Sequence, residues 1–213
     1  MRTEQLIDAL ARDPTPVDAG AARRRFALLL ALGPLAALVL MMVLLRPRPD
    51  LAAAIHLPMF WIKVLWPALV AVAACVLLDR LAHPGAKLGG SPAAALAPTV
   101  LVVLLGAVVL WRAEPGERVA LLLGQTWYEC PFLIALLAAP ALGFALRALR
   151  GFAPTRLPLA GAAAGLFAGA AAAFAYAFHC PEMQAPFLAV WYVLGMLIPA
   201  AVGAVLGRRM LRW

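Results

Sequence analysis

Two cysteine–proline steps carry the most evident side-chain chemistry in this chain of 213 residues. They are Glu129-Cys130-Pro131 and Cys180-Pro181-Glu182. Each step lies at the end of a long apolar run and beside a carboxylate. A thiolate is a nucleophile and a ligand for soft metal ions. Two thiols at one surface could therefore form a disulfide, react with an oxidant or bind a metal.

The neighbours of the two thiols extend this chemistry. His179 precedes Cys180, and Glu129 and Glu182 flank the pair. Two thiolates, an imidazole and a carboxylate would suit a transient Zn²⁺ or Cd²⁺ ion, and no obligatory cofactor is expected. The ligands come from separate segments without CxxC or CxxH spacing. A structural disulfide, a sensing pair and two incidental thiols therefore all remain open.

Composition assigns the chain to the membrane proteins. Hydrophobic residues make up 65% of the sequence, charged residues make up 13%, and the mean hydropathy is +0.93. A soluble domain does not carry such a composition. The net charge of +8 lies between apolar runs and not on a polar face, so we expect no direct contact with nucleic acid.

We expect an all-α integral membrane protein, a bundle of six transmembrane helices. Apolar runs of about 20 residues are long enough to cross the bilayer, and helices satisfy their own backbone hydrogen bonds there. The expected spans are 26–45, 59–78, 92–111, 131–149, 157–178 and 187–206.

The distribution of Lys and Arg predicts the orientation. With the N-terminus inside, thirteen of these residues are cytoplasmic, four are outside, and Lys63 lies within the second span. This bias favours cytoplasmic termini in a multi-pass protein of the bacterial inner membrane. Cys130 and Cys180 would then both face the oxidising periplasm.

Small residues recur every fourth position in the last two spans. Gly161, Gly165 and Gly169 share one face of the fifth span, and Gly203 and Gly207 share one face of the sixth. Such faces let membrane helices approach closely.

Two further residues within the second span need an interpretation. Lys63 lies near one end of the span, so we expect its side chain to reach outward to the interface. Cys75 lies among apolar residues and is expected to pack as a small hydrophobic side chain.

Several functional classes fit poorly. No Asp, Glu or Arg lies in the middle of a span, whereas a transporter usually needs such groups. Quinone-linked thiol oxidoreductases would need paired cysteines in one loop, and each outer loop here has one. We expect no enzyme, and keep a membrane thiol–disulfide oxidoreductase or a small-solute transporter as the alternative.

The segment 1–25 precedes the transmembrane domain 26–213. Its residues Thr3–Ala11 predict a short amphipathic helix, which Asp13–Val17 would end. Leu6, Ile7 and Leu10 form an apolar patch beside polar residues such as Asp8. A short helix of this kind could fold by docking in a groove of a partner protein.

These features together resemble a known family. The leading segment Thr3–Ala11, the following Thr-Pro, a basic stretch, six spans and two separated outer cysteines look like the NrsF type of integral membrane anti-sigma factor. The resemblance covers nearly the whole chain, with its short motifs in the expected order.

The resemblance implies a function in transcription regulation and stress response. The segment 1–25 would hold an extracytoplasmic-function sigma factor at the cytoplasmic face, through Leu6, Ile7, Asp8 and Leu10. Cys130 and Cys180 would be the sensor pair for heavy metals or oxidants, and their modification would release the sigma factor. The partners would then be this protein and the lipid bilayer.

Overall fold

The computed structural model describes residues 3–12 and 19–212, and every regular element in them is helical. Six helices there are long and apolar enough to cross a membrane. They are α2 (Ala19–Leu44), α4 (Pro58–Ala82), α5 (Ser91–Arg112), α7 (Cys130–Leu149), α8 (Leu157–Tyr176) and a final helix made of α9 (Ala185–Phe187), the π-helical turn η1 (Leu188–Tyr192) and α10 (Val193–Met210). The all-α prediction is confirmed.

The predicted span boundaries agree with these helices except at the start of α2. The other boundaries differ by at most four residues, as at the end of α4, observed at 82 and predicted at 78. By contrast, α2 begins at Ala19 and not at residue 26, because the helix continues through the basic residues before the apolar run.

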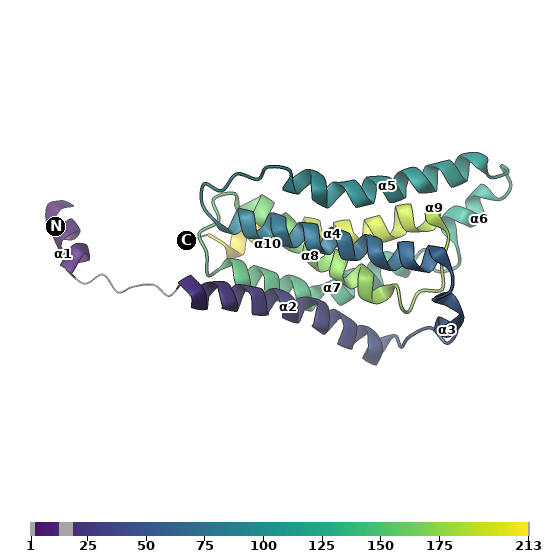
Figure 1. Ribbon diagram of the computed structural model, residues 1–213, viewed down its shortest axis with the longest axis horizontal. Coiled ribbons are helices and arrows are strands. Elements are labelled where there is room, and N and C mark those ends of the chain that lie inside the picture. The colour runs from purple at the N-terminus through teal and green to yellow at the C-terminus, as the bar shows by residue number, and fades with distance from the viewer. Residues whose placement is uncertain (1–2, 13–18, 213) are drawn as a thin grey trace.

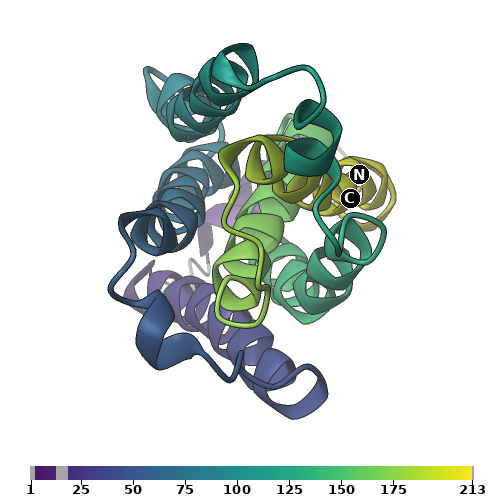
Figure 2. The same cartoon turned by 90° about the vertical axis from the view of Figure 1, so that its right-hand side faces the viewer.

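Helix α8 occupies the centre of the bundle (Figures 1 and 2). It packs against α2, α4, α7 and α10, and it is the most buried of the six long helices. Helix α5 lies at the periphery, against α4 and the segment α9–η1, and is the least buried. The outward faces carry large apolar side chains, as a surface in contact with lipid requires.

The small residues of α8 and α10 bring these two helices into close contact. A Cβ atom added at Gly161 would collide with the carbonyl of Gly203, and one added at Gly165 would collide with the carbonyl of Pro199. The expectation that such small faces let helices approach closely is confirmed for this pair. At this contact the two backbones touch directly, without interdigitating side chains between them. Such packing is favourable where no hydrophobic force drives the association of helices.

The bundle has two ends. The thiol end carries the segments 45–57, 113–129 and 177–184, with the short helices α3 (Leu51–Ala54) and α6 (Arg118–Leu123) that the sequence analysis did not predict (Figure 1). The terminal end carries the loops 83–90 and 150–156, the start of α2 and the end of α10. There, Arg150 Nε donates a 3.2 Å hydrogen bond to the Met210 carbonyl.

The predicted N-terminal helix is present as α1 (Thr3–Arg12). Ile7 and Asp8 are exposed on it. The side chains of Leu6 and Leu10 lie outside the described part of the structure, as does the segment 13–18 that contains the predicted helix stop.

The contact between α8 and α10 predicts opposite effects for two glycine substitutions. Gly165→Ala forces the backbones apart and should destabilise the protein by about 1–3 kcal/mol, the usual range for overpacking. Gly143→Ala in α7 meets no neighbouring atom, so it should be neutral or stabilising. Thermal unfolding of both variants in mild detergent measures the difference. Equal losses of stability would contradict the close contact.

Candidate functional site

Both cysteines of interest lie at the thiol end and are completely buried. Cys130 is the first residue of α7, where Pro131 is favourable because the first helical turn needs no donor from it. Cys180 follows α8, and its N–H donates a 3.0 Å hydrogen bond to the Tyr176 carbonyl. The local structure at the two helix ends thus points both thiols into the bundle.

The two thiols meet. Cys130 and Cys180 lie close enough for each side chain to act on the other, and all three cysteines of the chain are free in this structure. Cys75 lies in the second half of α4, nearer the terminal end, and is not part of this pair.

Lys63 is the main correction to the sequence analysis. Its side chain does not reach outward: it is 0% exposed, and Nζ donates hydrogen bonds to the carbonyls of Cys180, at 2.6 Å, and Glu182, at 2.8 Å. The prediction was wrong because the segment after Cys180 folds back over α4 and presents its carbonyls to the ammonium group. A buried ammonium must find such acceptors.

Arg48 holds the same segment from the other side. Its guanidinium approaches the carbonyls of Cys180 and Pro181 at 3.4 and 3.5 Å, and its backbone N–H donates to the Phe178 carbonyl at 3.0 Å. It also pairs with Asp50 at 2.6 Å. The hydrogen bond between them raises the pKa of Arg48 and lowers the pKa of the Asp50 carboxyl.

Two buried tyrosines complete the surroundings of the thiols. The rings of Tyr176 and Tyr192 lie 5.8 Å apart, and Lys63 Nζ lies 5.6 Å from the centre of the Tyr192 ring. Among the described residues, the Tyr192 hydroxyl has no well-aligned hydrogen-bond partner, although it lies near enough to act on the Cys180 thiol. Tyr192 ends the π-helical turn η1, a type of irregularity that is frequent at functional sites.

The predicted metal ligands other than the thiols make separate contacts. His179 Nδ1 hydrogen-bonds to the Arg46 carbonyl at 2.7 Å. Glu182 accepts a 2.7 Å hydrogen bond from the Gln125 N–H, while Glu129 is exposed at the start of α7. Within residues 3–12 and 19–212, no three His, Cys, Asp or Glu side chains gather closely enough to hold a metal ion.

The environment favours a thiolate at Cys180. The neighbouring Cys130 thiol, the ammonium group of Lys63 and the backbone N–H of Glu182 act against burial and lower the pKa of the Cys180 thiol. The pair can thus hold one thiol and one thiolate. This combination suits nucleophilic attack on an oxidant, disulfide formation or ligation of a soft metal.

The sequence analysis did not single out Lys63, Arg48 or Tyr192 as members of this site. The sequence does contain one indication for Lys63, since it is the one charged residue in the expected span 59–78. Nothing in the local sequence pairs it with the segment 180–182.

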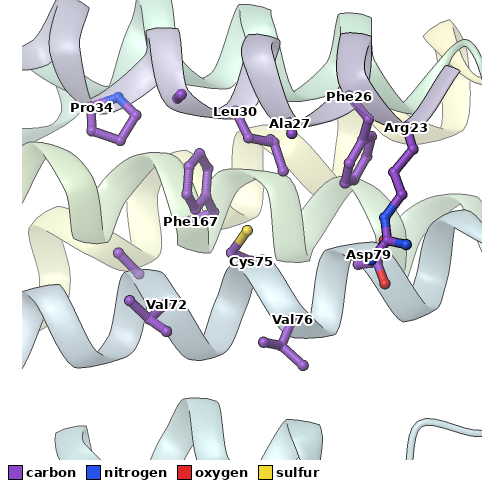
Figure 3. Close-up of a pocket in the computed structure, with 12 residues that line it drawn as sticks. Arg23, Phe26, Ala27, Leu30, Pro34, Val72, Cys75, Val76, Asp79 and Phe167 are labelled. Carbon is purple, nitrogen blue, oxygen red and sulfur yellow. The ribbon is translucent and has the colours of Figure 1, made fainter. Parts of the chain in front are cut away.

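Cys75 lines a different feature, an apolar groove of about 550 Å³ between α2, α4 and α8. Figure 3 shows Cys75 with Phe26 and Phe167 along the groove and with Arg23 and Asp79 at one end. These surroundings agree with the interpretation of Cys75 as a packing residue.

The contact between the thiols predicts which disulfide forms on mild oxidation. Treating the purified protein with diamide should link Cys130 to Cys180 within one chain and leave Cys75 reduced, because only the first two are in contact. Peptide mapping by mass spectrometry identifies the linked pair. A product that contains Cys75, or only links between chains, would contradict this geometry.

Known proteins resemble this chain over nearly its whole length. The family described as "NrsF: Negative regulator of sigma F" matches residues 10–213. The chain is 48% identical over 213 residues to the "Probable anti-sigma-F factor NrsF" of Azospira oryzae, and 42% identical over 217 residues to the "Anti-sigma-F factor NrsF" of Caulobacter vibrioides. Both alignments cover all of each chain, and no solved structure matches. The chain therefore belongs to the NrsF family of negative regulators of sigma F.

Proposed function

We propose that this protein is an inner-membrane anti-sigma factor whose thiol pair controls the release of its partner. The partner is a sigma factor of the extracytoplasmic-function type, held at the cytoplasmic face. The stimulus is a heavy metal or an oxidant that reacts with Cys130 and Cys180. The observation that carries the proposal is the contact of these two buried thiols in a chain whose relatives are named anti-sigma-F factors.

The distribution of charge supports this orientation. Arg23, Arg24 and Arg25 lie in the first turns of α2, and Arg208 and Arg209 lie in the last turn of α10. All of them belong to the terminal end, so the positive-inside rule favours a cytoplasmic terminal end and a periplasmic thiol end.

The N-terminal segment 1–25 supplies the partner-binding element of the proposal. Ile7 and Asp8 are exposed on α1, which leaves an apolar and an acidic side chain available to a partner. Leu6 and Leu10 extend the apolar patch in the sequence. An amphipathic helix of this kind recognises a groove through side chains spaced three or four residues apart.

The stimulus acts on the pair by one of two routes. In oxidation, the Cys180 thiolate attacks a peroxide oxygen and forms a sulfenic acid, and the Cys130 thiol then displaces water to give the disulfide. In metal binding, both thiols lose their protons to a soft ion such as Zn²⁺ or Cd²⁺, with His179, Glu129 or Glu182 joining after the outer segments rearrange.

Either route acts directly on the junction of two adjacent helices. Cys130 begins α7 and Cys180 follows α8, and these helices are joined at the terminal end by the loop 150–156. A change in their relative position at the thiol end would therefore reach the opposite end of the bundle. Moving a two-state equilibrium from 1:99 to 99:1 takes about 5.5 kcal/mol of differential binding, which metal–thiolate bonds could supply.

The first experiment measures the sensing role in cells. A reporter that depends on the sigma factor should be induced by Cd²⁺ or peroxide with the unchanged protein, and should lose at least tenfold of that induction with Cys130→Ser or Cys180→Ser. Cys75→Ser serves as the matched control and should keep full induction. Unchanged induction in both test variants would overturn the sensor assignment.

The second experiment measures partner binding. Ile7→Asp places a charge on an exposed position of α1, so the bundle should fold normally while affinity for the sigma factor falls at least tenfold. A peptide of residues 1–25 should compete with the full-length protein in the same assay. Full affinity of the variant together with failure of the peptide to compete would remove this segment from the interface.

A further inference from the structure

The apolar groove between α2 and α4 is open at the outer surface of the bundle. Both helices pack against α8, but they do not pack closely against each other. The groove between them holds about 550 Å³; the buried ring of Phe167 and the exposed side chain of Val72 both line it (Figure 3). An apolar space of this kind does not attract water. In a bilayer, the hydrocarbon chains of lipids are the molecules available to fill it.

The length of the groove matches one leaflet of the bilayer. Along α2 it is lined from Arg23 to Pro34, which corresponds to roughly 16 Å at the rise of an α-helix. One leaflet contributes about half of the roughly 30 Å of hydrocarbon in a bilayer. An acyl chain can therefore lie along the whole groove while its head group stays at the terminal end.

At the terminal end the groove continues into a second hollow that contains polar groups. This hollow also holds about 550 Å³, and it shares Arg23 and Asp79 with the groove. His83 and Phe152, from the two loops of the terminal end, line its other side, and their rings lie 5.1 Å apart. An apolar groove that continues into a polar hollow matches the two parts of a phospholipid, the acyl chain and the head group.

Arg23 and Asp79 give the hollow a positive and a negative group that do not pair with each other. Among the described residues, the ion pairs are Arg48 with Asp50 and His83 with Asp79, and the second is long, at 4.0 Å. Figure 3 shows Arg23 and Asp79 at the same end of the groove. A guanidinium group is a preferred partner of phosphate, and a carboxylate accepts hydrogen bonds from an ammonium group. A head group with both charges therefore complements this hollow, whereas Asp79 would repel a purely anionic one.

We propose that the groove and the hollow form a binding site for one zwitterionic phospholipid of the phosphatidylethanolamine class. An acyl chain lies between α2 and α4, the phosphate binds Arg23, and the ammonium group binds Asp79. The lipid fixes the position of α2 relative to α4, two helices that otherwise meet through α8. The site lies at the terminal end, away from Cys130 and Cys180, and does not depend on the proposed function of these thiols.

The experiment measures which phospholipid the full-length protein retains. The protein, purified in mild detergent and stripped of lipid, is mixed with equal amounts of phosphatidylethanolamine, phosphatidylglycerol and phosphatidylcholine that carry identical acyl chains. Phosphatidylglycerol has no cation, and the trimethylated ammonium group of phosphatidylcholine has no proton to donate. Native mass spectrometry counts the molecules of each lipid that remain bound.

The unchanged protein should retain one phosphatidylethanolamine molecule at least fivefold more often than either other lipid. Arg23→Gln and Asp79→Asn should each lower this retention at least threefold, because each removes one of the two charges. Arg24→Gln is the matched control for Arg23→Gln. It removes the neighbouring exposed charge, which lines neither the groove nor the hollow, and should change nothing.

A second pair of variants tests the groove itself. Ala31→Phe places a ring in the space assigned to the acyl chain, so it should lower retention at least threefold while Arg23 and Asp79 are intact. Ala97→Phe makes the same change at an exposed position of α5 and serves as the control. Phosphatidylethanolamine with a photoreactive group on its acyl chain should attach to residues 27–34 and 71–76, which peptide mapping identifies.

Two outcomes would overturn the proposal. One is equal retention of the three lipids, or a preference for either of the other two. The other is photoadducts that are spread evenly over the outer helix faces, or that are absent from the groove because the N-terminal segment or a second copy of the chain fills it. Neither measurement involves a sigma factor or the thiol end, so failure of the proposed function would leave both results unchanged.

Discussion

The ammonium group of Lys63 imposes the arrangement of the thiol end. A cation inside an apolar bundle needs acceptors, and the carbonyls of Cys180 and Glu182 provide them at 2.6 and 2.8 Å. To bring these carbonyls to Lys63, the backbone after α8 turns inward and passes over α4. The same turn buries Cys180 and brings it against Cys130 at the start of α7. The chemistry of the thiols thus depends on a fully buried amino group beside the backbone of Cys180.

The helices around this site differ in how tightly they are packed. The pair α8–α10 forms a rigid side, and α7 forms a side that can adjust its position. Helices α8 and α10 are in backbone contact through Gly161, Gly165 and Gly203, and such a contact tolerates little sliding. Helix α7 packs against both α8 and α10, and its Ile134 side chain lies against Gly195 of α10. A reaction that pulls Cys130 toward Cys180 would therefore shift α7 against a rigid α8–α10 pair. A two-state change of this kind is what a sensor with a distant output requires.

Sequence patterns predicted the parts of this structure that depend on local periodicity. Apolar run length predicted the six helices, and the four-residue spacing of Gly161 and Gly165 predicted a helix face that permits close packing, because both signals act within one helix. The position of both cysteines at one end followed from the number of spans. Lys63 was misjudged because its partners lie more than a hundred positions away, in a segment whose path only the folded chain determines. The contact of the Glu182 carboxylate with the Gln125 N–H was likewise hidden, since the two residues lie 57 positions apart in the chain.

The central claim is that the state of the Cys130–Cys180 pair sets the affinity for the sigma factor at the opposite end of the bundle. The most direct measurement is the dissociation constant of the full-length protein in lipid nanodiscs for its sigma factor, with the pair reduced and then oxidised or loaded with Cd²⁺. The account predicts binding at least tenfold weaker after modification, which corresponds to about 1.4 kcal/mol or more. Equal affinity in both states, with modification of both cysteines verified, would contradict it.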